Sequence, residues 1–473
     1  MDLRKCVVAG SMVAGLLHCA AAQAQSSAPV DPYPVPAAGW GGEAGKGLYA
    51  TRWVEDWTAL RAAGKAPRFK AMPLWGNATL TLNAETRLRY VNNDNAQLVP
   101  HNDFDQGLLR GILGADLRFN DNARVYGEIG RGEVWGNREA ATASFKNVGS
   151  LQQLFVDVRG HAGDTLIGAI VGRQEFTDGP KQLLSIGDGS TLHRTWNGVR
   201  VYVHGPRWRL GVYDFRLTRL GRGGFDDEEV DHGERLRGLN ASWIVSPDTY
   251  FDPFWIHSEK PGFRSGGLTG LDDRDTFGAR LWGKHDKFRY DWTVAHQAGR
   301  YRDTQPIDTW ALFAVQSVDL SSKGWKPRLI SHIDIASGGG AYGTGTLRSF
   351  NPLYASSGYL GEAQFLTLSN LLMIAPGISV APSAKWSGFV EYGFARRLDE
   401  NDAVYAGSMR AYPNTQRVPG HEIGGLLRVA ATWAPTPNFS LTFNYEHLDA
   451  GDVLQRAGQG SGSQGFVSAT YRY

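Results

Sequence analysis

The dominant pattern along the chain is an alternation of apolar and polar positions with a period of two. In residues 79–90, most even positions are apolar and the odd positions are polar or charged. The pattern returns in residues 109–119, 199–204, 277–284, 289–294 and 441–446. A period of two places apolar side chains on one face of a β-strand and polar side chains on the other. We therefore predict an all-β chain.

The predicted strands are separated by short and long connections that alternate along the chain. Short connections are expected at residues 120–123, 160–164, 205–206, 246–249, 284–287, 321–325, 381–384 and 435–438. Long connections are expected near residues 91–105, 132–149, 176–192, 219–234, 259–273, 299–307, 337–361, 397–418 and 448–463. Eight short and nine long connections join 18 strands, with both ends of the sheet on the short-turn side. Short periplasmic turns opposite long extracellular loops are typical of a transmembrane β-barrel of antiparallel strands.

A soluble β-sandwich or propeller is the alternative, because its strands alternate too. Here the apolar face is crowded with Trp, Tyr and Phe near strand ends, and the opposite face carries charge on nearly every strand. Both features favour the membrane barrel, whose aromatic girdles lie at the lipid interfaces. A closed barrel of this size is too wide for side chains to fill, so we expect a channel whose lumen holds water or inward-folded loops.

The two ends of the chain carry targeting features. A short basic start and an apolar stretch precede Ala22-Gln23-Ala24, where a signal peptidase would cut. We predict a cleaved export signal at residues 1–24, a periplasmic extension at 25–75 and the barrel at 76–473. The extension is interpreted as a tether with one helix, with a plug of the inner mouth as the alternative. The alternation up to the terminal Tyr473 resembles the signal that the outer-membrane assembly machinery recognises, so we expect that machinery as a partner.

Composition excludes several classes of protein. The 49 Lys and Arg against 47 Asp and Glu give a net charge of +2, so a strongly basic nucleic-acid binder is excluded. Beyond the predicted signal no run of 18 apolar residues occurs, which excludes a helical membrane protein. The only two cysteines, Cys6 and Cys19, lie within that signal, so neither a disulfide nor a thiolate metal site is expected.

Arginine dominates the basic residues, because only 12 of the 49 are Lys. Its guanidinium is a fixed fork of donors suited to carboxylate or phosphate, and rings of such charges in a lumen attract anions. The polar strand faces carry Arg87, Arg89, Arg110, Arg118, Arg124, Arg159, Arg200, Arg216, Arg280, Arg289 and Arg428. Acidic residues share these faces, among them Glu85, Asp116, Glu128 and Asp157. We predict anion conduction for the set as a whole, and for each single arginine either a substrate contact or a structural ion pair.

No cofactor, metal or catalytic group is predicted. The histidines show no paired metal-ligand spacing, and neither a Gly-x-Ser-x-Gly element nor a compact acid pair is present. The acidic run at residues 226–231 matches no calcium-loop spacing. We interpret it as a solvated loop, with a divalent-cation site as the alternative.

Several short motifs, in this order and spacing, resemble the alginate export family of outer-membrane channels. They are Trp53-Val54-Glu55-Asp56-Trp57 with Leu60, Arg87-Leu88-Arg89-Tyr90, Gly172-Arg173-Gln174-Glu175, Arg194-Thr195-Trp196-Asn197-Gly198-Val199-Arg200 and Phe350-Asn351-Pro352-Leu353-Tyr354. The resemblance spans about residues 50–473 and implies a monomeric barrel through which a polyuronate leaves the cell past an arginine-rich constriction. It implies anion contacts at Arg87, Arg89, Arg173, Arg194 and Arg200, with Gln174 and Glu175 shaping the same wall.

The leading hypothesis is a passive outer-membrane channel, not an enzyme, that exports an anionic polysaccharide of the alginate type. The first alternative is a general or uptake porin for small anions or oligosaccharides. A barrel enzyme or a protein that displays its long loops for adhesion is the second. Outer-membrane lipid and lipopolysaccharide are expected around the barrel, whereas no nucleic acid is expected as a partner.

Overall fold

The computed structural model describes residues 48–136, 142–177, 181–221, 223–225, 229–340 and 342–473. The predicted export signal and residues 226–228 of the acidic run lie outside these ranges. Ahead of the barrel come η2 (Arg52–Val54), α2 (Thr58–Ala62) and β1 (Met72–Pro73). None of the helices in the described residues has the length and apolar character needed to cross a membrane.

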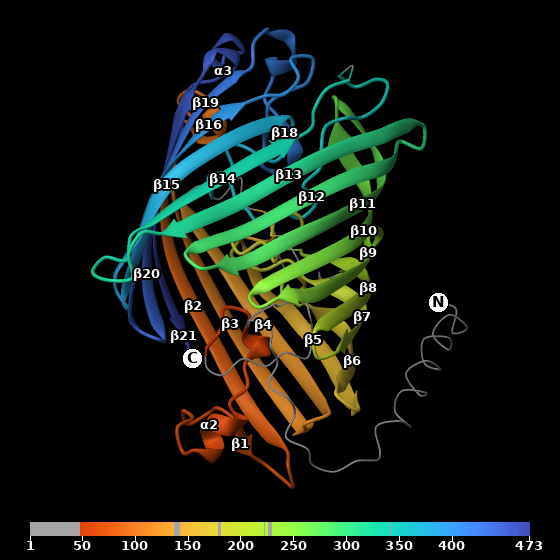
Figure 1. The fold of residues 1–473 in the computed structure, drawn as a ribbon, viewed down its shortest axis with the longest axis vertical. Helices are drawn as coiled ribbons and strands as arrows, with labels where there is room; N and C mark the ends of the chain where they lie inside the picture. Colours follow the sequence, from red (N-terminus) through yellow and green to blue (C-terminus); the bar gives the residue numbers. More distant parts are fainter. Residues whose placement is uncertain (1–47, 137–141, 178–180, 222, 226–228, 341) are drawn as a thin grey trace.

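Eighteen antiparallel strands form the barrel, as the alternation predicted (Figure 1). The first nine are β2 (Thr79–Asp94), β3 (Phe104–Asn120), β4 (Ala123–Gly136), β5 (Asn147–Ala162), β6 (Thr165–Gln174), β7 (Trp196–His204), β8 (Trp208–Arg219), β9 (Glu229–Ser246) and β10 (Thr249–Ser265). The other nine are β11 (Leu268–His285), β12 (Phe288–Tyr301), β13 (Gln305–Asp319), β14 (Arg328–Ala336), β15 (Leu371–Ser383), β16 (Trp386–Arg396), β19 (Glu422–Thr436), β20 (Phe439–Ala450) and β21 (Gly462–Arg472).

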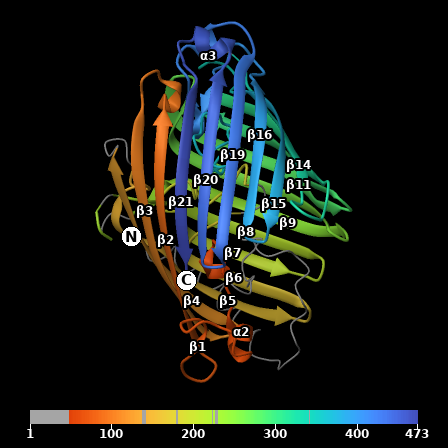
Figure 2. The same ribbon diagram turned by 90° about the vertical axis from the view of Figure 1, so that its left-hand side faces the viewer.

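The barrel closes where its first and last strands meet. β2 pairs with β3 on one side and with β21 on the other, and the three strands run side by side in Figure 2. The backbones of Ala84 and Tyr473 exchange two hydrogen bonds of 2.8 and 3.0 Å at this seam. Closure leaves no unpaired strand edge, which a lipid environment requires because it offers no hydrogen-bond partners.

The connections follow the predicted alternation of short and long. All eight short turns lie where the sequence placed them, at the end of the barrel that also carries α2 and β1 (Figure 1). The long connections at the other end contain η3 (Ala96–Leu98), β17 (Tyr405–Ala406), η4 (Gly407–Met409), β18 (Arg410–Ala411), η5 (Thr415–Arg417) and α3 (Asp452–Arg456).

Two predicted long loops are instead extensions of strands. β10 and β11 continue to a two-residue turn at Gly266 and Gly267, within the predicted loop 259–273. Both glycines have positive φ, +57° and +78°, which is the backbone that a tight hairpin turn requires. The predicted loop 299–307 is likewise reduced to residues 302–304, between β12 and β13. These strands therefore reach further than the sequence pattern indicated.

The two faces of the barrel differ as the alternation predicts. On β2 the side chains of Leu82, Leu88 and Tyr90 are exposed on the outside, whereas Glu85 and Arg87 are buried on the inside. The main hydrophobic cluster lies inside the barrel, where residues of long connections pack against inward side chains of the strands. Inward-folded connections thus fill part of the lumen, one of the two expectations for a barrel of this width.

Candidate functional site

The connection between β6 and β7, residues 175–195, folds into the lumen and lies against β2 and β3. Arg87 donates to two backbone carbonyl oxygens of residues 188–191, at 2.6 and 2.8 Å. Its cross-strand partner Arg110 donates to three carbonyls of the same stretch. Arg89 donates to one more, at 3.4 Å. Three arginines on the inner wall therefore hold this connection by its backbone.

This arginine cluster retains a surplus of positive charge. Asp188 lies 2.7 Å from Arg110 and 3.3 Å from Arg87, so one carboxylate serves both guanidinium groups. Glu85 lies 3.0 Å from Arg110 but is shared with two further arginines, at 2.9 and 3.0 Å. Arg89 has one carboxylate nearby, that of Glu362 at 3.8 Å. The hydrogen bonds to residues 188–191 otherwise end on carbonyl oxygens, which carry only partial charge. An anion that replaced those carbonyls would gain a stronger, charge-assisted interaction.

His193 links the same connection to the inner wall. Its Nε2 lies 2.8 Å from the carboxylate of Asp188, and its Nδ1 faces the carboxylate of Glu175. Burial and the nearby Arg110 lower the pKa of His193, but the two carboxylates outweigh them and raise it above its ordinary value. Only a protonated imidazole donates from both nitrogens at once. The adjacent Gln174 is fully buried in the same wall, next to Glu175 as the sequence motif places it.

The connection between β14 and β15, residues 337–370, also enters the lumen. On β19, Arg428 donates to two of its backbone carbonyl oxygens, at 2.8 and 2.9 Å. On β20, the carboxylate of Glu446 accepts the backbone N–H groups of Glu362 and Ala363, each at 2.9 Å. β19 and β20 follow β21 on the other side of the seam from β2 and β3, and this part of the wall therefore holds a second connection by its backbone.

The two inward connections bind each other. The N–H of Tyr354 donates to the carbonyl of Leu183 at 2.9 Å, and the N–H of Ser356 donates to that of Lys181 at 2.8 Å. Arg194 donates to the carbonyl of Tyr354 at 3.1 Å, and its guanidinium lies 5.0 Å from the centre of the tyrosine ring. Together the two connections form a single structure inside the barrel, called the partition below.

A third element in the lumen comes from the region before the barrel. Residues 51–57, called the inserted segment below, place Arg52 between Glu85 on β2 and Glu128 on β4. Both ion pairs measure 3.0 Å, and all three side chains are about 1% exposed or less. Burial lowers the pKa of Arg52, but the carboxylates of Glu128 and Glu85 outweigh it and hold it well above its ordinary value.

The next residue fixes the inserted segment to several further strands. Trp53 packs edge-on against Phe155 of β5, with ring centres 6.0 Å apart. The guanidinium of Arg200 on β7 lies 4.8 Å from the tryptophan ring, and Arg124 on β4 donates to the Trp53 carbonyl at 2.7 Å. The inserted segment therefore occupies the lumen beside β2 to β7.

Several predicted wall residues hold this segment. Asp116 pairs with Arg118 at 3.0 Å and with Arg124 at 3.3 Å, and Asp157 pairs with Arg124 at 3.0 Å. Arg118 also donates to the backbone carbonyl of Glu55 at 2.8 Å. Of the two roles left open for each arginine, these contacts favour the structural one for Arg118.

Two of the predicted lumen arginines face outward, which corrects their placement. Arg173 is on the same face of β6 as the exposed Val171, and its Nε donates to Asn197 at 3.0 Å. Arg216 lies opposite Asn197 on β8, on the face that carries Val199 of β7. Neither side chain lines the lumen.

The physical reason is a change in the outer face of these strands. Toward the long connections, outward positions carry ion pairs such as Asp214 with Arg235, at 2.8 Å, and Arg237 with Glu259. The next outward-facing pair toward the short turns is apolar and consists of Leu239 and Trp255, both of which are exposed. The strands extend past their apolar band, so charge alone does not identify the inner face there.

The other predicted arginines form local contacts. Arg280 binds both carboxylate oxygens of Asp291, each at 2.6 Å, and Arg289 lies 3.4 Å from Asp319. Arg159 donates to a carbonyl in the turn between β3 and β4, at 2.9 Å. These residues are spread around the wall near the short turns and are not part of the arginine cluster.

Three important residues were not among the predicted site residues: Arg52, Asp188 and His193. Arg52 adjoins the motif that begins at Trp53, but nothing local indicates that it enters the barrel. Asp188 and His193 lie in a connection, where the alternation that marked the wall residues is absent. Within the described residues, no group of three or more His, Cys, Asp or Glu side chains is arranged to hold a metal ion.

The family model described as alginate export matches residues 78–468. The chain belongs to the alginate export family. This match begins just before β2 and ends within β21, so it covers nearly the whole barrel. None of the curated proteins compared with the chain matches it.

The barrel of this alginate export family member also resembles solved outer-membrane channels of Pseudomonas aeruginosa. For the outer membrane protein opdK the TM-score is 0.54 at 12% identity, covering 83% of this chain and 98% of that one. For OccK8 (OprE) the TM-score is 0.56 at 9% identity, with coverage of 83% and 98%. For OccD3 (OpdP) it is 0.55 at 12% identity, with coverage of 83% and 91%. At these identities the likeness concerns the fold, and with the family it identifies an outer-membrane channel.

Proposed function

We propose that this channel passes an anionic polysaccharide of the polyuronate type out of the cell, through contacts with the arginine cluster. The observation that carries the proposal is the way Arg87, Arg89 and Arg110 bind residues 188–191, mainly through backbone carbonyls. These donors are arranged for oxygen acceptors, and carboxylates match their charge only in part, because Asp188 serves two of the arginines and Glu85 is shared with two more. Membership of the alginate export family supports the same class of substrate.

In the proposed mechanism the polymer displaces the backbone that the arginines now hold. A uronate carboxylate accepts two parallel N–H donors from one guanidinium, which a single carbonyl oxygen does not. Arg87 and Arg89 are two positions apart on the same face of β2, so successive carboxylates would find donors along one strand. Several contacts of moderate strength let a chain bind and still move on. Synthesis of the polymer or a concentration gradient would supply the driving force.

The second candidate is a porin for small anions. The partition narrows the lumen, which favours small substrates over a polymer unless it moves. One channel of similar fold, OpdK, was solved with vanillate, at a TM-score of 0.55 and 12% identity. A small-anion porin would use the same arginines without lifting residues 188–191 from them.

The test is single-channel recording of the refolded protein in planar bilayers. Arg87→Gln with Arg89→Gln is compared with Arg173→Gln and Arg216→Gln, a pair that removes the same charge from the outer face. We expect the first pair alone to shift the reversal potential in a salt gradient away from anion selectivity. It should also weaken block by polymannuronate about tenfold, or about 1.4 kcal/mol.

Three results would contradict the proposal. An unchanged reversal potential in the inner pair would remove the arginine cluster from selectivity. Block by neutral dextran as strong as that by polymannuronate would indicate an unselective pore. Anion conductance with no block by any polymer would favour the small-anion porin. Heat-modifiable migration of each variant on a gel shows that it has folded before it is recorded.

A further inference from the structure

A cavity of about 360 Å³ opens in the lumen at the short-turn end of β14, β15, β16 and β19. Six of its lining residues matter here: Lys326, Arg328, Ser379, Ser387, Phe389 and Thr432. Arg328 lies on the face of β14 that also carries the inward His332, and Phe389 lies on the face of β16 that carries the buried Glu391. The cavity is therefore on the inside of the barrel.

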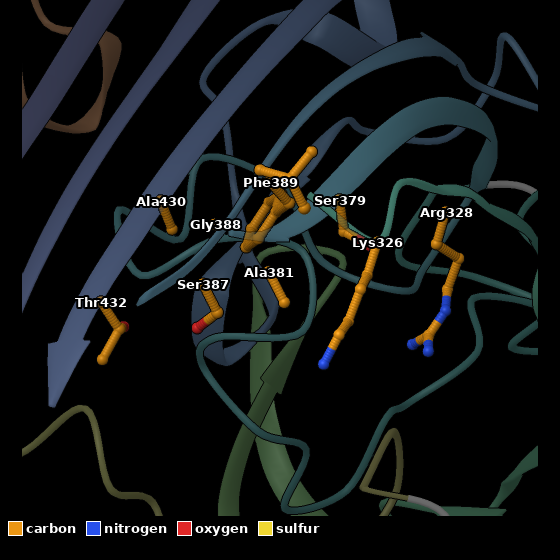
Figure 3. Close-up of a pocket in the computed structure, with 10 residues that line it drawn as sticks. Lys326, Arg328, Ser379, Ala381, Ser387, Gly388, Phe389, Ala430 and Thr432 are labelled. Carbon is orange, nitrogen blue, oxygen red and sulfur yellow. The ribbon is translucent and has the colours of Figure 1, made fainter. Parts of the chain in front are cut away.

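The cationic side chains of the cavity lie together. Figure 3 shows Lys326 and Arg328 side by side, with their charged ends pointing the same way. The Nε of Arg328 donates to Asp319 at 2.5 Å, and Arg289 approaches the same carboxylate to 3.4 Å. Two guanidinium groups thus share one carboxylate, and Lys326 adds a further positive charge to the lining.

The rest of the lining suits a sugar ring. Phe389 offers an apolar face beside the cations, and Ser387 and Thr432 bring hydroxyl groups that donate and accept hydrogen bonds (Figure 3). An aromatic ring covers the apolar face of a ligand, whereas Lys and Arg bind its carboxylate. A bare small anion would not use the aromatic ring, and a neutral sugar would not use the two cations.

The inserted segment occupies a different side of the lumen from the cavity. Its contacts through Arg52 and Trp53 are with strands β2 to β7, on the other wall. The cavity lies beside β14 to β19. On β19, Arg428 lies four positions before Thr432 in the sequence and on the same inner face. It is therefore about 13 Å further along the strand from the short-turn end. Its guanidinium is 5.8 Å from the ring of Phe389 and binds the partition.

We propose that this cavity is an inner subsite that holds one hexuronate residue before the polymer reaches Arg428 and the partition. Lys326 and Arg328 bind its carboxylate, Phe389 packs against its ring, and the hydroxyls bind its hydroxyl groups. The inference rests on the proposed function and adds to it a first binding position, at the short-turn mouth.

The experiment records block by oligomannuronate added to one side of the bilayer at a time. Lys326→Gln with Arg328→Gln is compared with Lys323→Gln and Lys385→Gln. The control lysines are exposed in the two adjacent turns and do not line the cavity, so the loss of charge at the mouth is equal. We expect the cavity pair to slow the onset of block from the short-turn side about tenfold, and the control pair to change it little. Phe389→Ala should shorten each blocking event and leave the reversal potential unchanged.

The outcomes separate this inference from the proposed function. Equal slowing by the cavity pair and the control pair would mean general attraction at the mouth, and would overturn the subsite. A loss of block that is the same from both sides would place the site deeper in the lumen and would also overturn it. No block of the unsubstituted channel from either side would instead contradict the proposed function itself.

Discussion

The guanidinium of Arg52 lies 3.0 Å from the carboxylate of Glu85, with both side chains about 1% exposed inside the barrel. The two residues are 33 positions apart, one before the barrel and one on its first strand. A buried ion pair withstands its desolvation only when its geometry is good and the remaining polar atoms are satisfied. Here a second carboxylate, that of Glu128, binds the same guanidinium at 3.0 Å, and the carbonyl of Ala50 accepts from it at 3.1 Å, which leaves its Nη2 as the one nitrogen with no hydrogen-bond partner in the described residues. The pair therefore anchors the inserted segment in the lumen.

Replacing Arg52 by Ala should release the inserted segment and widen the conducting path. Removal of one partner of a buried ion pair costs about 3–5 kcal/mol. This loss of free energy weakens the docking of the segment and not the barrel wall, because Glu85 retains its ion pairs with Arg110 and Arg472, at 3.0 and 2.9 Å. We expect a larger single-channel conductance than in Arg68→Ala, which alters an exposed arginine before the barrel. Equal conductance in both folded variants would mean that the segment does not limit the current.

The docking of residues 188–191 should weaken as the pH rises. The pKa of His193 is raised in the folded protein, mainly by Glu175 and Asp188 against burial and Arg110. The stabilisation is therefore complete below the ordinary histidine pKa of about 6.5 and is lost as pH climbs through the raised value. Bilayer recordings from pH 6 to 9 should show more frequent switching between conductance levels at the alkaline end.

The control for this pH dependence is a neutral side chain at the same place. His193→Gln should show the alkaline behaviour at every pH, whereas His101→Gln, at an exposed histidine, should keep the normal profile. A profile in His193→Gln identical to that of the unsubstituted channel would assign the effect to another group.

The sequence predicted the barrel well because lipid and water impose the pattern locally. Each strand of the barrel separates an apolar outer face from a polar inner face, so the alternation in Leu80 to Tyr90 reports the fold residue by residue. The same logic failed for Arg173 and Arg216. Their part of the wall extends beyond the apolar band, where outward positions also carry charge, as at Asp214 and Arg235.

The contents of the lumen were harder to predict, because no local pattern encodes them. Arg52 pairs with Glu128, which is 76 positions away in the sequence, and Arg110 pairs with Asp188, which is 78 positions away. A guanidinium that binds a distant backbone leaves no periodic signal in the sequence. Residue type did carry some information, since arginine was singled out for its forked donors. Which acceptor each arginine binds depended on how the connections fold inward.

Glu446→Ala should loosen the second half of the partition. The carboxylate of Glu446 accepts two backbone N–H groups, from Glu362 and Ala363 at 2.9 Å each, and its side chain is fully buried. Hydrogen bonds to a charged group contribute about 1.5–3 kcal/mol each. We expect a noisier open level and a higher mean current. Asp449→Ala, on the opposite face of the same strand, is the matched control, and equal noise in both would contradict the role of Glu446.

The last prediction measures how far the apolar band extends along β7. Val201 is exposed on the outer face between the outward-facing side chains of neighbouring strands, so Val201→Arg should cost about 2–4 kcal/mol if it lies near the bilayer midplane. Asn197→Arg, four positions along the same face, sits level with Arg173 and Arg216 and should cost about 0–1 kcal/mol for its depth. Asn197→Leu, which also removes the hydrogen bond from Arg173, corrects for the loss of that contact. Urea unfolding in lipid vesicles gives both values, and Val201→Leu controls for a change of size. A cost for Asn197→Arg equal to that for Val201→Arg would mean that the outward charges of β6 and β8 lie within the hydrocarbon layer, and would contradict the correction made for Arg173 and Arg216.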